Sequence, residues 1–313
     1  MPLATSLPAP LTGVVPPLCT PLTDTGQVDV RSLAALTEHL VSAGVDGLFV
    51  LGSTGEAAYL SDDQRRTVIE TVVGTAGGRL PVLAGAIDMA TARVLDHART
   101  ACGLGADAIV ATAPFYTRTH PAEISDHYTR LRNAVDLPLF AYDIPPAVHT
   151  KLPSDTVLAL AGEGVLAGLK DSSGDDGALR RLLVRLRAVD PAFSVLTGSE
   201  LSVDGALLAG AHGVVPGLGN VDPAGYVRLY AHAREGRWRA AAAEQDRLAA
   251  LFSLTDVGDE NEMGRSSSAL GAFKAALHML GVIAAPATAA PQLPLDDAAN
   301  RTVRRLLEEA GLL

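Results

Sequence analysis

The chain has 313 residues, of which 48% are hydrophobic and 19% are charged. This length provides a sizeable core and corresponds to one large α/β domain or to two ordinary domains. With 25 Lys and Arg against 35 Asp and Glu, the formal net charge is −10. Such a charge disfavours binding to nucleic acid or to an anionic membrane through the net field of the protein.

The cysteines and the first residues of the chain indicate the compartment. Cys19 and Cys102 are too few for a disulfide framework or a cysteine-rich zinc site, so we expect two reduced thiols in the core. Met1–Pro10 lacks the basic and apolar regions of a signal peptide, and no apolar stretch is long enough to span a membrane. We therefore expect a soluble cytoplasmic protein with a flexible segment at residues 1–10.

Eight short apolar runs recur along the chain, and longer amphipathic stretches separate them. Because the runs are continuously apolar rather than alternating, they are typical of strands that are covered on both faces. Their spacing of roughly 20 to 35 residues fits one strand and one helix per unit. The predicted strands are Gly13–Val15, Gly47–Leu51, Pro81–Ala86, Ala108–Ala113, Leu137–Tyr142, Val165–Leu169, Ser194–Thr197 and Gly213–Val215.

The stretches between the runs have the spacing of amphipathic helices, and a capping box at Ser61–Gln64 begins one of them. Eight strand–helix units predict a (β/α)8 barrel over residues 11–235. A doubly wound open sheet is the alternative, but no phosphate-binding fingerprint follows its first strand. Residues 236–313 predict a C-terminal α-helical region, with helices at Trp238–Leu254, Ser268–Leu280 and Asp297–Glu309.

In such a barrel the chemistry lies at the carboxyl ends of the strands, and Lys170 directly follows the run Val165–Leu169. An amine in an apolar barrel mouth loses hydration, which favours the neutral form that attacks carbonyls and forms Schiff bases. An ion pair with Asp171 or another carboxylate is the structural alternative. Position alone fits both interpretations.

Hydroxyl groups follow other strands. Tyr142 and Tyr116 could each transfer a proton through the phenol, and both could equally be packing residues. Ser53 and Thr54 lie in the turn Gly52–Gly55, where two hydroxyls and backbone N–H groups suit a carboxylate at a helix N-terminus. A simple N-cap is the alternative there. The eight histidines are scattered without metal-ligand spacing, so we expect no metal.

Five motifs occur together in one order along nearly the whole chain. With these motifs the sequence resembles the pyruvate-dependent class I aldolase superfamily that includes dihydrodipicolinate synthase and N-acetylneuraminate lyase. The motifs are Gly52–Glu56, Pro114–Tyr116, Tyr142–Pro145, Gly168–Ser173 and Gly210–Val214.

The resemblance implies roles for particular residues. Lys170 matches the lysine that forms the Schiff base, and Tyr142 matches the tyrosine that relays protons. Ser53 and Thr54 match the hydroxyl pair that binds the carboxylate of the 2-oxo acid. Tyr116 matches a relay tyrosine that reaches into the site of a neighbouring subunit. The resemblance also implies a homo-oligomer, usually a tetramer built as a dimer of dimers, with no organic cofactor or metal.

The chain departs from the family pattern at two positions. Ala147 stands where the synthases carry an arginine for the carboxylate of the aldehyde, and alanine cannot make that charge-assisted contact. Glu200 stands where the neuraminate lyases have an Asp–Glu pair. Both residues, together with Val215 at the end of the last predicted strand, are assigned to the substrate pocket.

These observations predict a lyase that joins or splits pyruvate, or another 2-oxo acid, and an aldehyde. We expect an aldolase of the 2-keto-3-deoxy-acid type with a covalent imine on Lys170. Three alternatives stay open: a true 4-hydroxy-tetrahydrodipicolinate synthase, which Ala147 disfavours, a 2-keto-3-deoxy acid dehydratase, and a non-catalytic protein that binds a 2-oxo acid.

Overall fold

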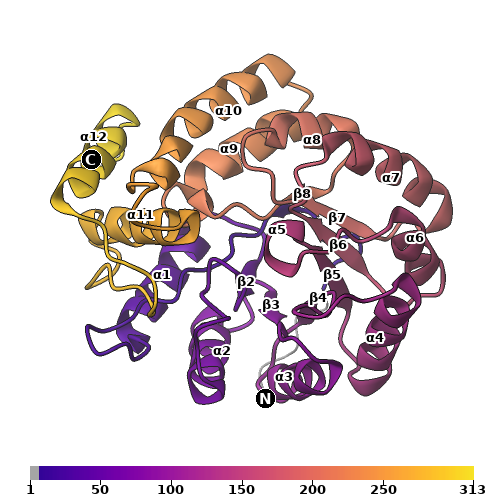
Figure 1. Ribbon diagram of the computed structural model, residues 1–313. Coiled ribbons are helices and arrows are strands. Elements are labelled where there is room, and N and C mark those ends of the chain that lie inside the picture. Colours follow the sequence, from indigo (N-terminus) through magenta and orange to yellow (C-terminus); the bar gives the residue numbers. More distant parts are fainter. Residues whose placement is uncertain (1–6) are drawn as a thin grey trace.

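A computed structural model describes residues 7–313 of the chain (Figure 1). Its centre is a parallel sheet in the order β1-β8-β7-β6-β5-β4-β3-β2. A parallel bridge between Pro17 and Phe49 joins the two ends of this order, and Leu18 N–H donates to Phe49 O at 2.8 Å. The sheet therefore closes into the predicted (β/α)8 barrel, and the doubly wound alternative is wrong.

The strands lie where the apolar runs predict them, with one shift that matters for the site. The predicted run Val165–Leu169 begins too early, because Val165 and Leu166 donate backbone hydrogen bonds to Leu160 at the end of the preceding helix. Lys170 consequently lies within a strand and not after it. The strands are β1 Gly13–Val14, β2 Leu48–Val50, β3 Val82–Gly85, β4 Ala108–Thr112, β5 Leu139–Asp143, β6 Gly168–Asp171, β7 Ser194–Thr197 and β8 Gly213–Val214.

Helices surround the barrel, as Figure 1 shows in a view that looks into the ring of strands. They are α1 Val30–Ser42, α2 Asp62–Ala76, α3 Thr91–Gly103, α4 Pro121–Ala134, α5 Pro145–Val148, α6 Ser154–Gly162, α7 Asp176–Val189, α8 Val203–Ala209 and α9 Pro223–Arg234. The short helix α5 directly follows β5 and was not predicted. A 3-10 turn, η1 Leu218–Asn220, follows β8.

The C-terminal region consists of α10 Trp238–Phe252, the 3-10 turn η2 Ser253–Asp256, α11 Arg265–Met279 and α12 Asp297–Glu309. It is tied to the barrel by polar contacts as well as by apolar packing. Ala284 N–H donates to Ser32 Oγ on α1 at 2.9 Å, and Ala289 N–H donates to Glu56 Oε1 at 2.7 Å. The region therefore anchors the loop that follows β2.

Two apolar cores result from this architecture. The larger lies between the sheet and the helices, and the smaller fills the inside of the barrel. The inner core contains Leu11, Val15, Phe49, Leu83, Ala108, Val110, Phe140, Tyr142, Leu196 and Val215, each at most 4% exposed. Successive side chains along each strand point alternately to the two cores. Every second residue of a strand therefore faces the barrel interior.

The structure also bears on the predictions about the cysteines and about membrane-spanning helices. Cys19 is buried, and burial raises the pKa of its thiol to about 12, but Cys102 is exposed, so the expectation of two core thiols is wrong for Cys102. Cys102 lies near the end of α3 on its solvent side, outside the buried set of that helix. None of the helices in residues 7–313 is both long and apolar enough to cross a membrane. Residues 1–6 of the segment expected to be flexible lie outside the described residues.

Candidate active site

Lys170 lies on β6 and faces the inside of the barrel. Its register partners are Tyr142 on β5 and Leu196 on β7, which both belong to the inner core. The side chain is 6% exposed, and Nζ lies 4.0 Å from the centroid of the Tyr142 ring and 5.0 Å from that of Phe49. The amine is thus held against two aromatic rings near the carboxyl end of the strand.

The chain has three lysines, and the other two form ion pairs. Lys151 pairs with Asp143, and Lys274 pairs with Glu56. Lys170 has no carboxylate within ion-pair distance among residues 7–313. The interpretation of Lys170 as a salt-bridge residue is therefore wrong.

The two acidic residues nearest in the sheet face the other way. Asp143 and Asp171 are register partners that alternate with Tyr142 and Lys170, so they point toward the helices. Asp143 accepts a hydrogen bond from Leu152 N–H at 3.1 Å in addition to its pair with Lys151. Burial raises the pKa of Asp143, although Lys151 acts in the opposite direction. Neither carboxylate is available as a counter-ion for Lys170.

Tyr142 and Thr112 continue the same row of inward-facing residues. Tyr142 is 3% exposed, and its ring meets the Phe49 ring edge-on, with centroids 6.3 Å apart. Thr112 on β4 is the register partner of Tyr142, and its buried Oγ1 has no hydrogen-bond partner. A buried hydroxyl without a partner is rare in proteins. Thr112 is therefore a site residue that the motif analysis missed.

Ser53 and Thr54 lie in a series of turns at residues 51–60, between β2 and α2. The expectation that they stand at a helix N-terminus is wrong, because α2 begins at Asp62 and Ser61 forms its capping box with Gln64. Ser53 is exposed and Thr54 is partly exposed. Neither hydroxyl has a hydrogen-bond partner within the described part of the chain, so both are free to bind a ligand.

The glycines of this turn are required by close packing. A Cβ at Gly52 would lie 2.7 Å from the Phe49 ring, and one at Gly55 would lie 3.0 Å from Leu51 N and 3.1 Å from Leu18 O. Ring and backbone atoms at these distances cannot move aside cheaply. The two glycines let the Ser53–Thr54 turn approach the inner core directly above Phe49.

A pocket of about 190 Å³ opens beside this turn at the carboxyl ends of β2 to β5. Ser53, Thr112 and Ala147 line it, whereas Lys170 and Tyr142 do not. Thr112 connects the two parts of the site, because it lines the pocket and is also level with Tyr142 in the sheet. The remaining lining residues are Gly52, Glu56, Ala57, Ala58, Tyr59, Ile87, Phe115, Ile144, Val148, Ser266 and Leu270.

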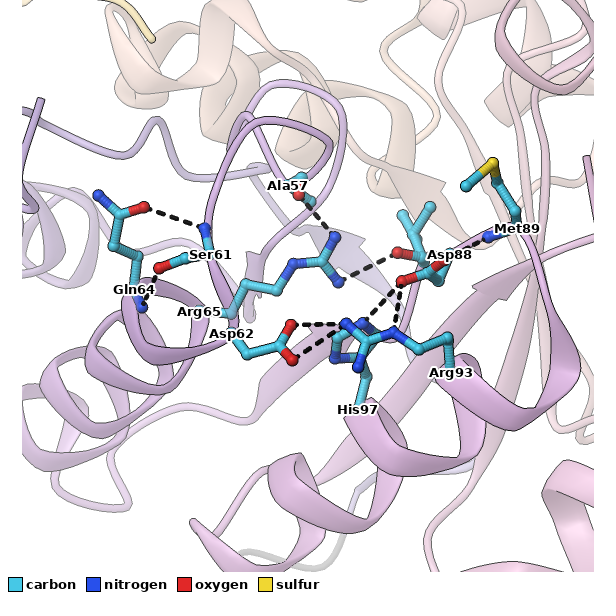
Figure 2. Close-up of polar contacts among 10 residues, drawn as sticks. Ala57, Ser61, Asp62, Gln64, Arg65, Asp88, Met89, Arg93 and His97 are labelled. Carbon is cyan, nitrogen blue, oxygen red and sulfur yellow. Dashed lines mark hydrogen bonds and ion pairs between the residues drawn. The ribbon is translucent and has the colours of Figure 1, made fainter. Parts of the chain in front are cut away.

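Arg65 on α2 holds two walls of the pocket together (Figure 2). Its guanidinium donates to Ala57 O at 2.7 Å and to Ile87 O at 3.1 Å, and Arg65 is 8% exposed. Ala57 lies in the loop after β2, and Ile87 lies in the loop after β3. One buried cation therefore fixes the two loops relative to each other.

Further charged side chains, Asp62, Asp88 and Arg93, lie near Arg65, as Figure 2 shows. Asp88 contacts His97 Nε2 at 3.1 Å and Arg93 Nε at 3.4 Å, and Arg93 also binds Asp62. Burial and the nearby Arg65 charge lower the pKa of His97. The hydrogen bonds from His97 and Met89 N–H outweigh burial and lower the pKa of Asp88. The cluster satisfies its own charges and supports the loops from outside.

Glu56 and Lys274 form a fully buried ion pair between the site loop and α11. Lys274 Nζ also donates to Ala287 O at 2.7 Å, and Glu56 accepts from Ala289 N–H. Glu56 itself has a positive φ of 58°. The pair therefore couples the last residue of the Gly52–Glu56 motif to the C-terminal region.

The structure brings together only part of the predicted site within one chain. Tyr116 lies on the loop after β4, and its side chain is 87% exposed to solvent in the single chain. Glu200 Oε1 accepts hydrogen bonds from Leu218 N–H at 2.8 Å and from the Tyr226 hydroxyl at 3.0 Å. Burial raises the pKa of Glu200 to about 7. Val215 is a buried residue of the inner core.

The sequence contains signals for Arg65 and Lys274, two buried residues that none of the motifs identifies. Arg65 occupies the apolar face of α2, in line with Val68 and Val72, and Lys274 interrupts a buried apolar stretch of α11. A single charged residue at a core position needs a buried partner. The partners themselves, two carbonyl groups and Glu56, could not be named from these patterns.

The chain was compared with known proteins. It matches the Dihydrodipicolinate synthetase family over residues 10–310. It is 32% identical to a 4-hydroxy-tetrahydrodipicolinate synthase of Phenylobacterium zucineum, covering 96% of this chain and 98% of that protein. It is 34% identical to a DapA-like lyase of Halobacterium salinarum, covering 98% and 96%.

The structure is similar to that of YagE, a prophage protein of the dihydrodipicolinic acid synthase family from E. coli K12, which was solved in complex with pyruvate. The TM-score is 0.90 at 28% identity, and the match covers 96% of this chain and 99% of the other. The chain therefore belongs to the Dihydrodipicolinate synthetase family of pyruvate-dependent lyases.

Proposed function

We propose that the chain joins pyruvate to an aldehyde, and splits the resulting 4-hydroxy-2-oxo acid, through an imine on Lys170. The observation that carries this proposal is the environment of Lys170: the side chain is buried beside two aromatic rings and has no carboxylate partner in the described residues. An amine that no carboxylate contacts within ion-pair distance is available as a nucleophile toward a ketone.

The reaction begins when Lys170 Nζ adds to C2 of pyruvate. The former carbonyl oxygen takes one proton from the amine nitrogen and one from the Tyr142 phenol, and it leaves as water to give an iminium ion. C3 then loses a proton, and the enamine carbon attacks the aldehyde carbon while the aldehyde oxygen takes up a proton. Water hydrolyses the imine, which releases the 4-hydroxy-2-oxo acid and the free lysine. The reverse sequence cleaves the same C–C bond.

Other residues orient the pyruvyl group. Ser53 and Thr54 hydroxyls bind its carboxylate, and their lack of partners supports this role. Tyr116 completes the proton relay in a neighbouring subunit of a homo-oligomer, a dimer of dimers, which accounts for an aromatic side chain that is 87% exposed in the single chain. The mechanism uses no organic cofactor and no metal, because the imine is the electron sink.

A true 4-hydroxy-tetrahydrodipicolinate synthase is the second candidate, favoured by the name of the Phenylobacterium relative. Ala147 on α5 argues against it. This residue lines the pocket, and no Lys, Arg or His side chain lines it within residues 7–313. An aldehyde that carries a carboxylate would therefore meet no cation in the pocket wall.

Borohydride reduction in the presence of pyruvate tests the proposal. We expect a stable pyruvyl adduct on Lys170, located by peptide mass mapping, and none on Lys151 or Lys274, which serve as internal controls because both are ion-paired. A Lys170→Arg variant should give no adduct. Binding of pyruvate without an adduct would favour a non-catalytic protein that binds 2-oxo acids. An adduct with loss of water from a 2-keto-3-deoxy acid, but no C–C cleavage, would favour a dehydratase.

A further inference from the structure

The pocket at the carboxyl ends of β2 to β5, which Thr112 connects to the row of Tyr142 and Lys170, has mainly apolar walls. Eight of its lining side chains are aliphatic or aromatic without a polar atom: Ala57, Ala58, Ile87, Phe115, Ile144, Ala147, Val148 and Leu270. The carboxylate of Glu56, the acidic residue in the lining, is engaged by Lys274 and by Ala289 N–H. The pocket thus offers no free charge within the described residues.

The polar groups in the wall are hydroxyls, and they are distributed unevenly. Ser53, Tyr59 and Ser266 are exposed at the rim. Thr112 is the deep one, 3% exposed, with its Oγ1 unpartnered and level with Tyr142. A single deep donor next to the imine end suits the oxygen of the reacting carbonyl and leaves the substituent of the aldehyde to the apolar walls.

This arrangement discriminates between classes of aldehyde. Ser53 at the rim is assigned to the pyruvate carboxylate, so a second carboxylate on the aldehyde would lose its hydration in the apolar part of these walls without a compensating charge-assisted hydrogen bond. Each hydroxyl of a sugar-derived aldehyde would need a partner that the deep walls lack. An alkyl or aryl substituent needs neither, and it gains from leaving water.

We propose that the second substrate of this enzyme is a neutral aldehyde with an apolar, aliphatic or aromatic substituent, bound with that substituent in the pocket at the ends of β2 to β5. The proposal rests on the proposed function, since it assumes that the aldehyde meets a pyruvyl imine on Lys170. It assigns the product as a 4-hydroxy-2-oxo acid with an apolar tail.

The test compares three four-carbon aldehydes with the full-length enzyme and saturating pyruvate: butanal, erythrose and succinic semialdehyde. At equal concentrations of the free aldehyde, we expect kcat/KM for butanal to exceed that for erythrose by about tenfold or more, and that for succinic semialdehyde by about 100-fold or more. Equal or higher kcat/KM with either polar aldehyde would overturn the proposal. Borohydride trapping with pyruvate alone distinguishes a failure of this inference from a failure of the proposed function. A trapped adduct combined with a preference for polar aldehydes refutes only this inference, and no adduct refutes both.

A paired substitution at the pocket wall provides a second measurement. Ala147→Arg should raise kcat/KM for succinic semialdehyde about tenfold or more and lower it for butanal, because it adds the missing cation. Ala147→Met is the matched control, with similar length and no charge, and it should not improve the use of succinic semialdehyde. An equal gain in both variants would show that size rather than charge limits the pocket, and it would overturn the proposal.

Discussion

The two ends of the site are built differently. The proposed imine end, with Tyr142 and Lys170, lies on β5 and β6, where ladder hydrogen bonds on both sides fix each residue in register. Apart from Thr112 on β4, the proposed aldehyde end is made of loops, α5 and one turn of α11, and side chains hold it together across long sequence distances. Motif residues occur at both ends, because Gly52, Ser53 and Phe115 line the pocket. The departure from the family pattern, Ala147, lies in the pocket wall. The strands therefore position the proposed imine chemistry, and the proposed specificity depends on side chains that loops and short helices position.

The contacts that support the aldehyde end are few and identifiable. Arg65 joins the loops after β2 and β3, and the Glu56–Lys274 pair joins the first of these loops to α11. If the two ends of the site differ in this way, substitutions on β5 and β6 should affect the chemical step. Substitutions of Arg65 or of the Glu56–Lys274 pair should affect stability and aldehyde binding.

Tyr142→Phe should have the largest effect. It removes the hydroxyl that is proposed to transfer protons but keeps the ring against which Lys170 packs, so kcat should fall by about 10² to 10⁴. The melting temperature should stay close to that of the native protein. Steady-state kinetics with pyruvate and an aldehyde, together with thermal unfolding, provide the measurement. A fall of less than about tenfold would mean that another group relays the proton.

Lys274→Met should be the most destabilising change at the aldehyde end. It leaves the Glu56 carboxylate buried and unpaired, which typically costs about 3–5 kcal/mol of unfolding free energy. The double variant Glu56→Gln/Lys274→Met should recover much of this loss, because the glutamine oxygen still accepts from Ala289 N–H. Denaturant unfolding of the single and double variants measures both values. If the second substitution brings no recovery, the cost comes from packing and not from the unpaired charge.

Arg65→Met should come next. It leaves the carbonyl groups of Ala57 and Ile87 without their donor, at a cost of about 2–3 kcal/mol. Because the two loops then move independently, KM for the aldehyde should rise more than kcat falls. Arg66→Met, an exposed neighbour on the same helix, is the matched control and should change neither value. Arg65→Lys should restore part of the aldehyde affinity, and a purely structural role would leave KM unchanged in the variants that fold.

Glu200 should produce the smallest effect, a pH dependence of stability. Its pKa in the folded protein is raised to about 7, above the ordinary value of 4.5, so folding favours the protonated form. The stabilisation is complete below about pH 4.5 and is lost as the pH rises through 7. Between pH 5 and pH 7, the unfolding free energy of the native protein should fall by about 2 kcal/mol relative to Glu200→Gln. If the unfolding free energies of the two proteins change with pH in the same way, Glu200 is ionised in the folded state throughout this range.

Much of the barrel could be predicted from local patterns. Runs such as Ala108–Ala113 are apolar because both faces of the strand are covered, and Ser61–Gln64 forms the predicted capping box. The strand boundary before Lys170 could not be predicted in the same way. Val165 and Leu166 are as apolar as strand residues, but their backbone groups cap α6 instead. The hydrophobicity of a residue indicates that its side chain is buried, but it does not indicate which group accepts the hydrogen bond from its backbone N–H.

The sequence by itself determined the barrel, the helical C-terminal region, the family and the identity of the lysine at the end of the sixth unit, because these depend on periodicity and on short motifs. Only the tertiary structure decided that Lys170 has no carboxylate partner, since the parity of the strand turns Asp143 and Asp171 to the opposite face. It also decided that Thr112 is unpartnered and that Arg65 and Lys274 hold the pocket. These properties are set by groups that lie far apart in the chain and that meet only when the barrel closes.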